Sequence, residues 1–340
     1  MIVLTRRRVV GVLFFLLLVL VLAGFVGLVV GPSALGPSDI LRVLRGADPG
    51  SAAADIVLRV RLPRVQLGML VGASLAVSGV LFQALLRNPL ADPFVLGVSG
   101  GAALGAILVL SLGASLGFGY AAVPPAAFAG SLAATGLLYA AAGFRGRVSA
   151  THLLLTGVVF NAFASAAIVF LASLAGLMDG ARIFLWLIGS LSASRADVAG
   201  AVALFLAIGL ACALPLARSL NLLTLGEESA QQLGIEVDRH RRILLVATSL
   251  MVGAAVSVAG LIGFVGLIIP HLLRLLLGSD HRLLIPAAAL GGAAFLVVCD
   301  TVARTLRLGR ELPVGAVTAL VGGPLFLYLL RRHQRRAFAP

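Results

Sequence analysis

The sequence has no lysine, and all 26 of its basic residues are arginine. A phosphate-binding P-loop requires a lysine, so the chain cannot form a standard ATP site of that kind. Schiff-base chemistry on lysine is excluded for the same reason. There are only two cysteines, Cys212 and Cys299, and they lie far apart in apolar segments. We interpret them as small core residues and predict neither a disulfide nor a metal site from them.

Charged residues are also scarce, because they make up 11% of the chain while 60% is hydrophobic, with a mean hydropathy of +1.11. A soluble domain is about half apolar and about a quarter charged, so this composition indicates an integral membrane protein. The net charge of +13 comes mainly from arginines in short segments between apolar runs. That distribution is typical of residues that orient membrane helices, and we predict no nucleic-acid partner.

Apolar runs long enough to cross a bilayer recur along the whole chain. A hydrocarbon core of about 30 Å requires about 20 helical residues. We therefore predict an all-α fold with a single transmembrane domain over residues 1–340 and about ten spans. The predicted spans are about Arg8–Val30, Pro63–Leu86, Phe94–Leu112, Ala121–Gly143, Thr151–Leu174, Ala196–Ala217, Ile243–Leu261, Gly263–Leu277, Leu283–Thr301 and Pro313–Leu330. An outer re-entrant or interfacial segment is predicted at Met178–Leu191.

The N-terminal apolar run, Val9–Val30, is longer than the roughly 7–15 residues of a signal-peptide core. A twin-arginine export signal at Arg6–Arg8 is a remote alternative, and we favour an uncleaved first helix. Ten spans predict a multi-pass protein with both termini in the cytoplasm.

Arginines in the predicted outer segments break the positive-inside rule. We expect them to serve a partner or a ligand; for Arg61, Arg64 and Arg304, snorkelling to lipid headgroups is the alternative. They are Arg42, Arg45, Arg59, Arg61, Arg64, Arg182, Arg304, Arg307 and Arg310.

A polar segment at residues 218–242 interrupts the apolar second half of the chain. It holds the densest cluster of acidic and amide side chains, with one or two short helices predicted between breaks at Gly226 and Gly234. One interpretation is a solvated connecting loop, since charged stretches are usually wet surfaces. The other is a docking element for a soluble partner on the cytoplasmic side.

The predicted spans have no carboxylate near their middles. Asp300 is the nearest candidate, and it lies near an outer end, at the spacing that pairs with Arg304 on a helix. Ion-coupled carriers usually need buried ionisable groups or unwound helices near the midplane. An ion-coupled secondary transporter is therefore the less favoured alternative. If the energy does not come from an ion gradient, we expect a partner to supply it at the polar segment.

Several motifs, in order and correctly spaced, resemble the permease subunits of type II ABC importers, which take up vitamin B12, ferric siderophores and haem. They are RLPR at 61–64, GxxLAxSGxxxQALLRNPLADPxxLGVSxGA at 72–102, LGEESAQQLG at 225–234, GLIGFVGLIIPHLLR at 260–274, GSDHR at 278–282 and ELPVGAVTALVGGPLFLYLL at 311–330. The resemblance implies ten helices per subunit, a location in the bacterial inner membrane and a permease that is not itself an enzyme. It implies a second permease copy, expected to form a homodimer in the lipid bilayer, two ATP-binding subunits and a soluble substrate-binding protein.

The resemblance also implies that ATP and Mg are used by the partner ATPase, and that this chain binds no cofactor. We expect the substrate to be an iron chelate, either a ferric siderophore or haem, because that branch of the family is the most populous. Cobalamin is the alternative.

Roles for particular residues follow from the same resemblance. Residues implied to couple the chain to the ATPase are Leu225, Gly226, Glu227, Glu228, Ser229, Gln232, Leu233 and Gly234. Residues implied to dock the binding protein are Arg61, Arg64 and Arg304, which can form forked bonds to carboxylates. Residues implied to form a cytoplasmic gate are Asn88, Leu90, Ser149, Ala150 and Thr151, although Ala150 stands where some relatives have a hydroxyl.

Three further expectations come from the residues themselves. Arg182, beside Trp186, is placed to face the outer mouth of a pathway and meet an anionic group of a substrate. No two histidines have metal-ligand spacing, so no metal site is predicted. His271 follows Pro270, and we favour a structural role for it, because a histidine can satisfy backbone groups that a proline frees.

Overall fold

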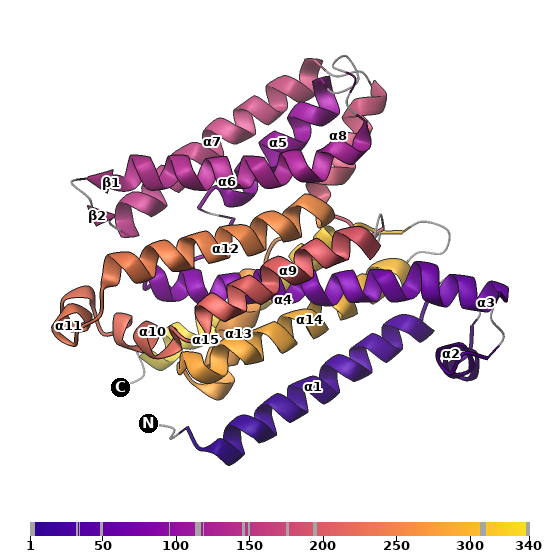
Figure 1. Cartoon of the computed structure of the whole chain (residues 1–340), viewed down its shortest axis with the longest axis horizontal. Helices are drawn as coiled ribbons and strands as arrows, with labels where there is room; N and C mark the ends of the chain where they lie inside the picture. Colours follow the sequence, from indigo (N-terminus) through magenta and orange to yellow (C-terminus); the bar gives the residue numbers. More distant parts are fainter. Residues whose placement is uncertain are drawn as a thin grey trace.

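Long helices that run roughly side by side form the computed structural model of the chain (Figure 1). It describes residues 4–31, 33, 35–47, 50–94, 96–112, 117, 119–144, 147–148, 150–174, 177–192, 196–306 and 311–337. The helices are α1 (Arg6–Val29), α2 (Pro37–Leu44), α3 (Ala52–Asp55), α4 (Leu62–Leu85), α5 (Val98–Leu112), α6 (Val123–Ala142), α7 (Ala150–Leu174), α8 (Leu177–Ile188), α9 (Ala196–Ala213), α10 (Ala217–Leu223), α11 (Glu227–Gln232), α12 (Val237–Ala259), α13 (Val265–Leu277), α14 (His281–Thr305) and α15 (Val314–Ala337).

Three small elements complete the description. A π-helical segment, η1 (Ile56–Arg61), joins α3 to α4, and a 3-10 turn, η2 (Tyr120–Ala122), precedes α6. The strands β1 (Gly143–Phe144) and β2 (Arg147–Val148) pair antiparallel, with Gly143 opposite Val148. The prediction of an all-α membrane fold is therefore confirmed, with this two-residue pairing as a minor exception among the described residues.

Each of the ten predicted spans corresponds to an apolar helix. Six helices of the described chain are long and apolar enough to cross a membrane, or seven if α9 and α10 form one broken span with a bend of 62°. The other three are the shorter apolar helices α5, α13 and the apolar part of α15, Val314–Leu329. Because Pro215 cannot donate a backbone hydrogen bond, the predicted sixth span ends in the bend between α9 and α10.

The second span begins earlier than predicted. One continuous helical stretch covers Ala52–Leu85, including residues that the sequence placed in an outer polar segment. Pro63 lies inside this stretch, where it lacks an N–H and crowds the preceding turn. The wider π-helical turn of η1 accommodates it, and the Leu62 N–H bonds to the Val57 carbonyl five residues back.

Helix α4 lies at the centre of the bundle. Every residue from Val71 to Leu86 is buried, and α4 contacts α14, α12, α13 and α9. Glycines allow this packing. A Cβ at Gly72 would lie 2.3 Å from the Gly292 carbonyl oxygen of α14, and one at Gly79 would lie 1.8 Å from the Gly266 carbonyl oxygen of α13. Small residues let membrane helices approach backbone to backbone, and here they hold α4 as a rigid rod.

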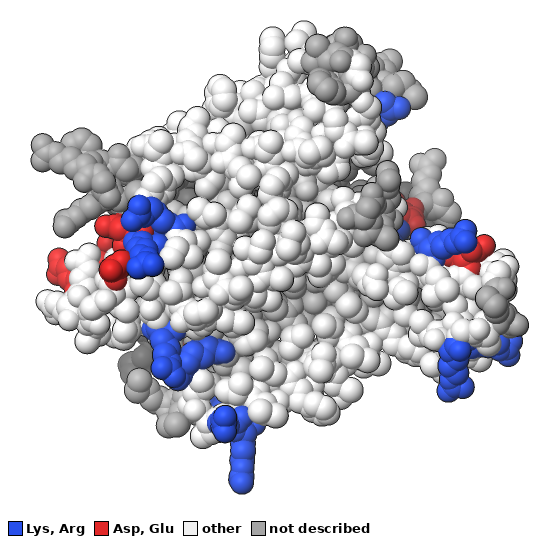
Figure 2. All heavy atoms as spheres, in the orientation of Figure 1, with Lys and Arg blue, Asp and Glu red and all other residues white. Residues whose placement is uncertain are grey.

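The two ends of the bundle differ. Both termini, α11 and the β1–β2 pair lie at one end, which we call the terminal end, and α2 and α3 lie at the other, the distal end (Figure 1). In Figure 2, arginine and acidic side chains gather at these two ends, and the surface between them is almost free of charge on this face. That apolar surface fits the hydrocarbon core of a bilayer.

We expect Gly79→Ala to destabilise the chain, because the new methyl group would overlap the backbone of α13, and overpacking of this kind costs about 1–3 kcal/mol. Thermal unfolding of the detergent-solubilised protein would show a lower midpoint. Gly136→Ala, on α6, is the matched control, because nothing lies within 4 Å of the position that its new methyl group would take. Equal midpoints for the two variants would contradict the close packing of α4.

Candidate coupling, gating and docking sites

The polar segment at the terminal end folds into α10, α11 and the first turn of α12. Gly226 (φ 122°) and Gly234 (φ 82°) flank α11 in backbone conformations that favour glycine, which confirms the predicted helix breaks. Ala230, in the middle of α11, is fully buried, whereas Leu225 and Leu233, which flank the helix, are 68% and 60% exposed. This helix therefore packs through one small side chain and presents two large apolar side chains to its surroundings.

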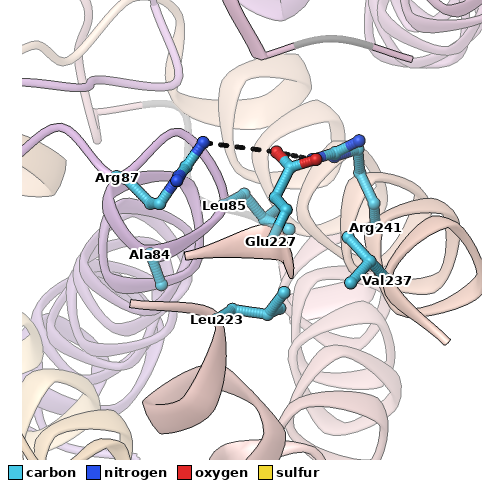
Figure 3. A pocket seen from close by; sticks show the side chains of 7 residues that line it. All are labelled: Ala84, Leu85, Arg87, Leu223, Glu227, Val237 and Arg241. Carbon is cyan, nitrogen blue, oxygen red and sulfur yellow. Dashed lines mark hydrogen bonds and ion pairs between the residues drawn. The ribbon is translucent and has the colours of Figure 1, made fainter. Parts of the chain in front are cut away.

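The acidic face of α11 is divided between internal and external roles. Glu228, Ser229 and Gln232 are exposed. The Glu227 carboxylate instead accepts hydrogen bonds from Arg241 Nη2 at 2.6 Å and from Arg87 Nη2 at 3.4 Å. Figure 3 shows this carboxylate between the two guanidinium groups, above a narrow crevice that is also lined by Leu223 and by the end of α4. Glu227 thus joins α11 to α12 and to the end of α4.

Arg87 ends α4 in an unusual conformation. Its φ of 49° is left-handed, and only one other non-glycine described residue, Phe264, has a positive φ. The Arg87 N–H bonds to the Ala84 carbonyl and the Asn88 N–H to the Gln83 carbonyl, which is the Schellman pattern that usually has glycine at this position. A non-glycine residue there costs about 1–2 kcal/mol.

The segment after Arg87 holds the predicted gate residues Asn88 and Leu90. Asn88 Oδ1 accepts the Leu90 N–H at 2.9 Å, and Asp92 Oδ1 accepts the Phe94 N–H at 2.8 Å. Leu90 is 40% exposed. Each of these side chains accepts a backbone N–H two residues further on, so they stabilise local turns within the segment.

The second predicted gate segment begins α7 at the same end of the bundle. Thr151 is exposed there, and α7 starts at Ala150. Ser149 lies outside the described residues.

At the distal end, the three arginines predicted to dock a partner are buried. Arg61, Arg64 and Arg304 are 3%, 6% and 6% exposed. In this structure these side chains bond within the bundle, and their docking role stays a prediction. Before they could dock a binding protein, their internal bonds would have to be exchanged.

The internal partners of these arginines explain their burial. Arg64 makes forked bonds of 2.9–3.1 Å to Asp300, which also pairs with Arg304 at 3.1 Å, so the predicted Asp300–Arg304 pair is confirmed. Arg304 and Arg61 also donate to the last carbonyls of α1, including those of Gly27 at 3.0 Å and Val29 at 2.8 Å. Cations at a helix C-terminus offset its partial negative charge, so the cluster fastens α1 to α4 and α14.

Other arginines remain on the distal surface. Arg42 and Arg45 are exposed at the end of α2, and the Arg59 side chain is 81% exposed although it pairs with Asp55 at 3.1 Å. Arg307 and Arg310 lie outside the described residues. Among the described residues, the exposed arginines are therefore better placed for an outside partner than the motif arginines that sequence reasoning selected. Sequence reasoning could not distinguish the exposed arginines from the buried ones, because burial depends on partners that lie far away in the sequence.

Arg182 and Trp186, predicted from the sequence to lie at the outer mouth of a pathway, both line one cavity. The cavity has a volume of about 840 Å³, and its lining also includes Tyr120, Ser192 and Ser257. Arg182 is exposed, whereas Trp186 is 8% exposed. Aromatic rings, hydroxyls and one guanidinium can hold a large, mostly apolar ligand that carries an acidic group.

No cluster of metal ligands was found among the described residues. His271 is buried on α13 after Pro270, and its ring meets Phe326 at a centroid distance of 6.1 Å. Cys212 and Cys299 form no disulfide.

This bundle, with its apolar middle and its polar ends, defines a polytopic membrane protein. The FecCD transport family matches residues 16–332, and the chain belongs to this family. It is 48% identical to the cobalamin import system permease protein BtuC of Halobacterium salinarum, over 84% of this chain and 76% of that protein. It is 40% identical to the hemin transport system permease protein HmuU of Yersinia pestis, over 97% of each.

Solved structures give the same result. An ABC transporter assigned to the metal-chelate type, in an inward-facing conformation, matches with a TM-score of 0.84 at 31% identity, over 95% of this chain and 99% of that chain. PsaBC from Streptococcus pneumoniae shares the fold, with a TM-score of 0.56 at 18% identity, over 81% of this chain and 93% of that chain. The chain is thus a multi-pass permease subunit of an ABC importer of the metal-chelate type, which confirms the family predicted from its motifs.

We expect Asp300→Asn to destabilise the chain by about 3–5 kcal/mol, because two buried guanidinium groups would lose their shared carboxylate. The reversible unfolding of the purified protein in SDS would measure this. Asp55→Asn removes an exposed ion pair and should change the stability by less than about 1 kcal/mol. Similar losses in both variants would show that the buried cluster does not fasten the helices.

Asp92, in the segment between α4 and α5, provides a pH test. Burial raises its pKa from 3.8 to about 6, although the Phe94 N–H bond lowers it. The folded chain then holds this proton more tightly than the unfolded chain, so stability is lost as the pH rises from about 4 to about 6. Asp92→Asn should remove that loss, which is roughly 3 kcal/mol at most. In the same SDS unfolding assay, repeated from pH 4 to pH 8, the difference in stability between the two proteins should change from about pH 4 to about pH 6 and stay constant above that. Parallel curves would contradict the raised pKa.

Proposed function

We propose that the chain forms the membrane pathway of an ATP-driven importer that moves a metal chelate into the cytoplasm. In this proposal the terminal end faces the cytoplasm and a separate ATPase binds at α11. A soluble binding protein delivers the substrate at the distal end, and a second permease copy completes the pathway. ATP and Mg belong to the ATPase.

The observation that carries the proposal is the surface of α11. Leu225 and Leu233, more than half exposed at its two ends, flank the exposed polar residues Glu228, Ser229 and Gln232. Apolar side chains that fill pockets within a polar rim are typical of protein interfaces. This surface lies next to the charged end of the bundle, beyond the apolar belt, where a soluble partner has access (Figures 1 and 2).

An ion-coupled carrier is less well supported. Among the described residues, the buried carboxylates are Asp92 and Asp300. Asp92 lies outside the helices, and Asp300 is shared by two arginines near the distal end of α14. Neither provides an ionisable group near the middle of a span, which such carriers usually need.

For the substrate we favour a metal tetrapyrrole, with cobalamin and haem as the first compounds to test. The relative at 48% identity is named for cobalamin and the relative at 40% is named for haemin. A cavity of about 840 Å³ that combines Trp186, Tyr120 and Arg182 suits a large, flat ligand with carboxylate or phosphate groups. A ferric siderophore, the other iron chelate expected from the sequence, remains the third candidate.

Reconstitution of the complex tests this function. We expect the chain to co-purify with an ATPase subunit, and a substrate-loaded binding protein to stimulate ATP hydrolysis and uptake into liposomes for one of cyanocobalamin, haemin or a ferric siderophore. Leu225→Ser with Leu233→Ser should reduce ATPase co-purification at least about tenfold, because removal of buried apolar anchors typically costs about 2 kcal/mol or more.

Leu306→Ser is the matched control, since Leu306 is 65% exposed beyond the distal end of α14. It should leave ATPase binding unchanged. If purified chain alone takes up substrate on an ion gradient, the proposed function is wrong.

A further inference from the structure

The residue that begins the predicted gate segment is also the residue that contacts α11. Arg87 occupies the left-handed end position of α4, and its guanidinium reaches the Glu227 carboxylate at 3.4 Å, 140 positions along the chain. An arginine kept where glycine would fit without strain indicates that its side chain has a role there. The Arg87 side chain connects the end of α4 to Glu227 of α11.

The two bonds to Glu227 have different characters. Arg241 is buried, with 5% of its side chain exposed, and its bond to Glu227 is 2.6 Å long. Arg87 is 44% exposed and its contact is longer, at 3.4 Å. A short bond from a buried cation is the durable one, whereas a long, exposed ion pair breaks and re-forms easily. Glu227 therefore has one fixed partner on α12 and one separable partner on the gate segment.

We propose that the Glu227–Arg87 contact transmits displacement of α11 to the gate segment, residues 87–94. In this role Arg87 and Glu227 are positioning residues, and the inference rests on the proposed docking of an ATPase at α11. When a partner shifts α11, Glu227 pulls or releases the Arg87 guanidinium (Figure 3). Asn88 follows Arg87 directly and its Oδ1 accepts the Leu90 N–H, so the displacement reaches Leu90 through this local turn.

Three variants isolate this contact. Arg87→Asn removes the guanidinium and keeps a residue that tolerates the left-handed conformation. Arg87→Lys retains the positive charge. Arg239→Asn is the matched surface control, because Arg239 forms a comparably long, exposed pair with Glu236 at 3.5 Å on the first turn of α12.

The thiol introduced by Leu90→Cys, in a Cys212→Ser background, reports movement of the gate segment. The parent complex with its ATPase is reconstituted in nanodiscs, and the rate of maleimide labelling is measured without nucleotide and with ATP, Mg and vanadate. We expect a nucleotide-dependent change in the parent, in Arg87→Lys and in Arg239→Asn. In Arg87→Asn the change should fall about two- to fivefold, the size expected for a partly exposed ion pair.

A second cycle tests the route through Glu227. In a Glu227→Gln background, Arg87→Asn should cause no further loss, because the contact is already weakened. A full response in Arg87→Asn, or an undiminished effect of this substitution in the Glu227→Gln background, would overturn the inference. A parent complex that binds no ATPase, or that shows no nucleotide response, would instead remove the proposed function and the inference with it.

Discussion

The close approach of α4 to its neighbours is the constraint on which the rest of the structure depends. Backbone contact with α13 and α14 at Gly79 and Gly72 leaves no space for side chains, so α4 cannot bend or rotate on its own. Helix α4 thus connects the two polar ends of the bundle. It carries Arg64 at the distal end and leads directly into Arg87 at the terminal end.

More of the arginines hold helices of the bundle together than the sequence suggests. Arg64 binds the carboxylates of Asp300 and Glu311, Arg304 shares Asp300, and Arg61 and Arg304 bind the end of α1. Arg241 binds Glu227 at the start of α11. Within an apolar bundle an unpaired guanidinium is costly, whereas a paired one is directional and strong. Among the described residues, the exposed leucines that flank α11 and the exposed arginines on α2 and η1 are the candidates for contacts with soluble partners.

The proposed importer function would give these features one purpose, with energy from a partner entering at one end of the bundle and substrate at the other. A tightly packed central helix suits that role, because packed helices move between discrete arrangements. The exposed ion pair between Glu227 and Arg87 is held less firmly than the buried contacts, which suits a contact proposed to transmit movement.

The sequence by itself determined the membrane class, the number of apolar helices, the breaks at Gly226 and Gly234 and the family, since these depend on composition, local periodicity and motif order. Tertiary structure alone decided which charges are available to partners. Arg64 meets Asp300, which lies 236 positions away, and no local pattern distinguishes it from the exposed Arg59. It also decided where the second span begins, because only the π-helical turn before Pro63 allows the helix to continue through a proline.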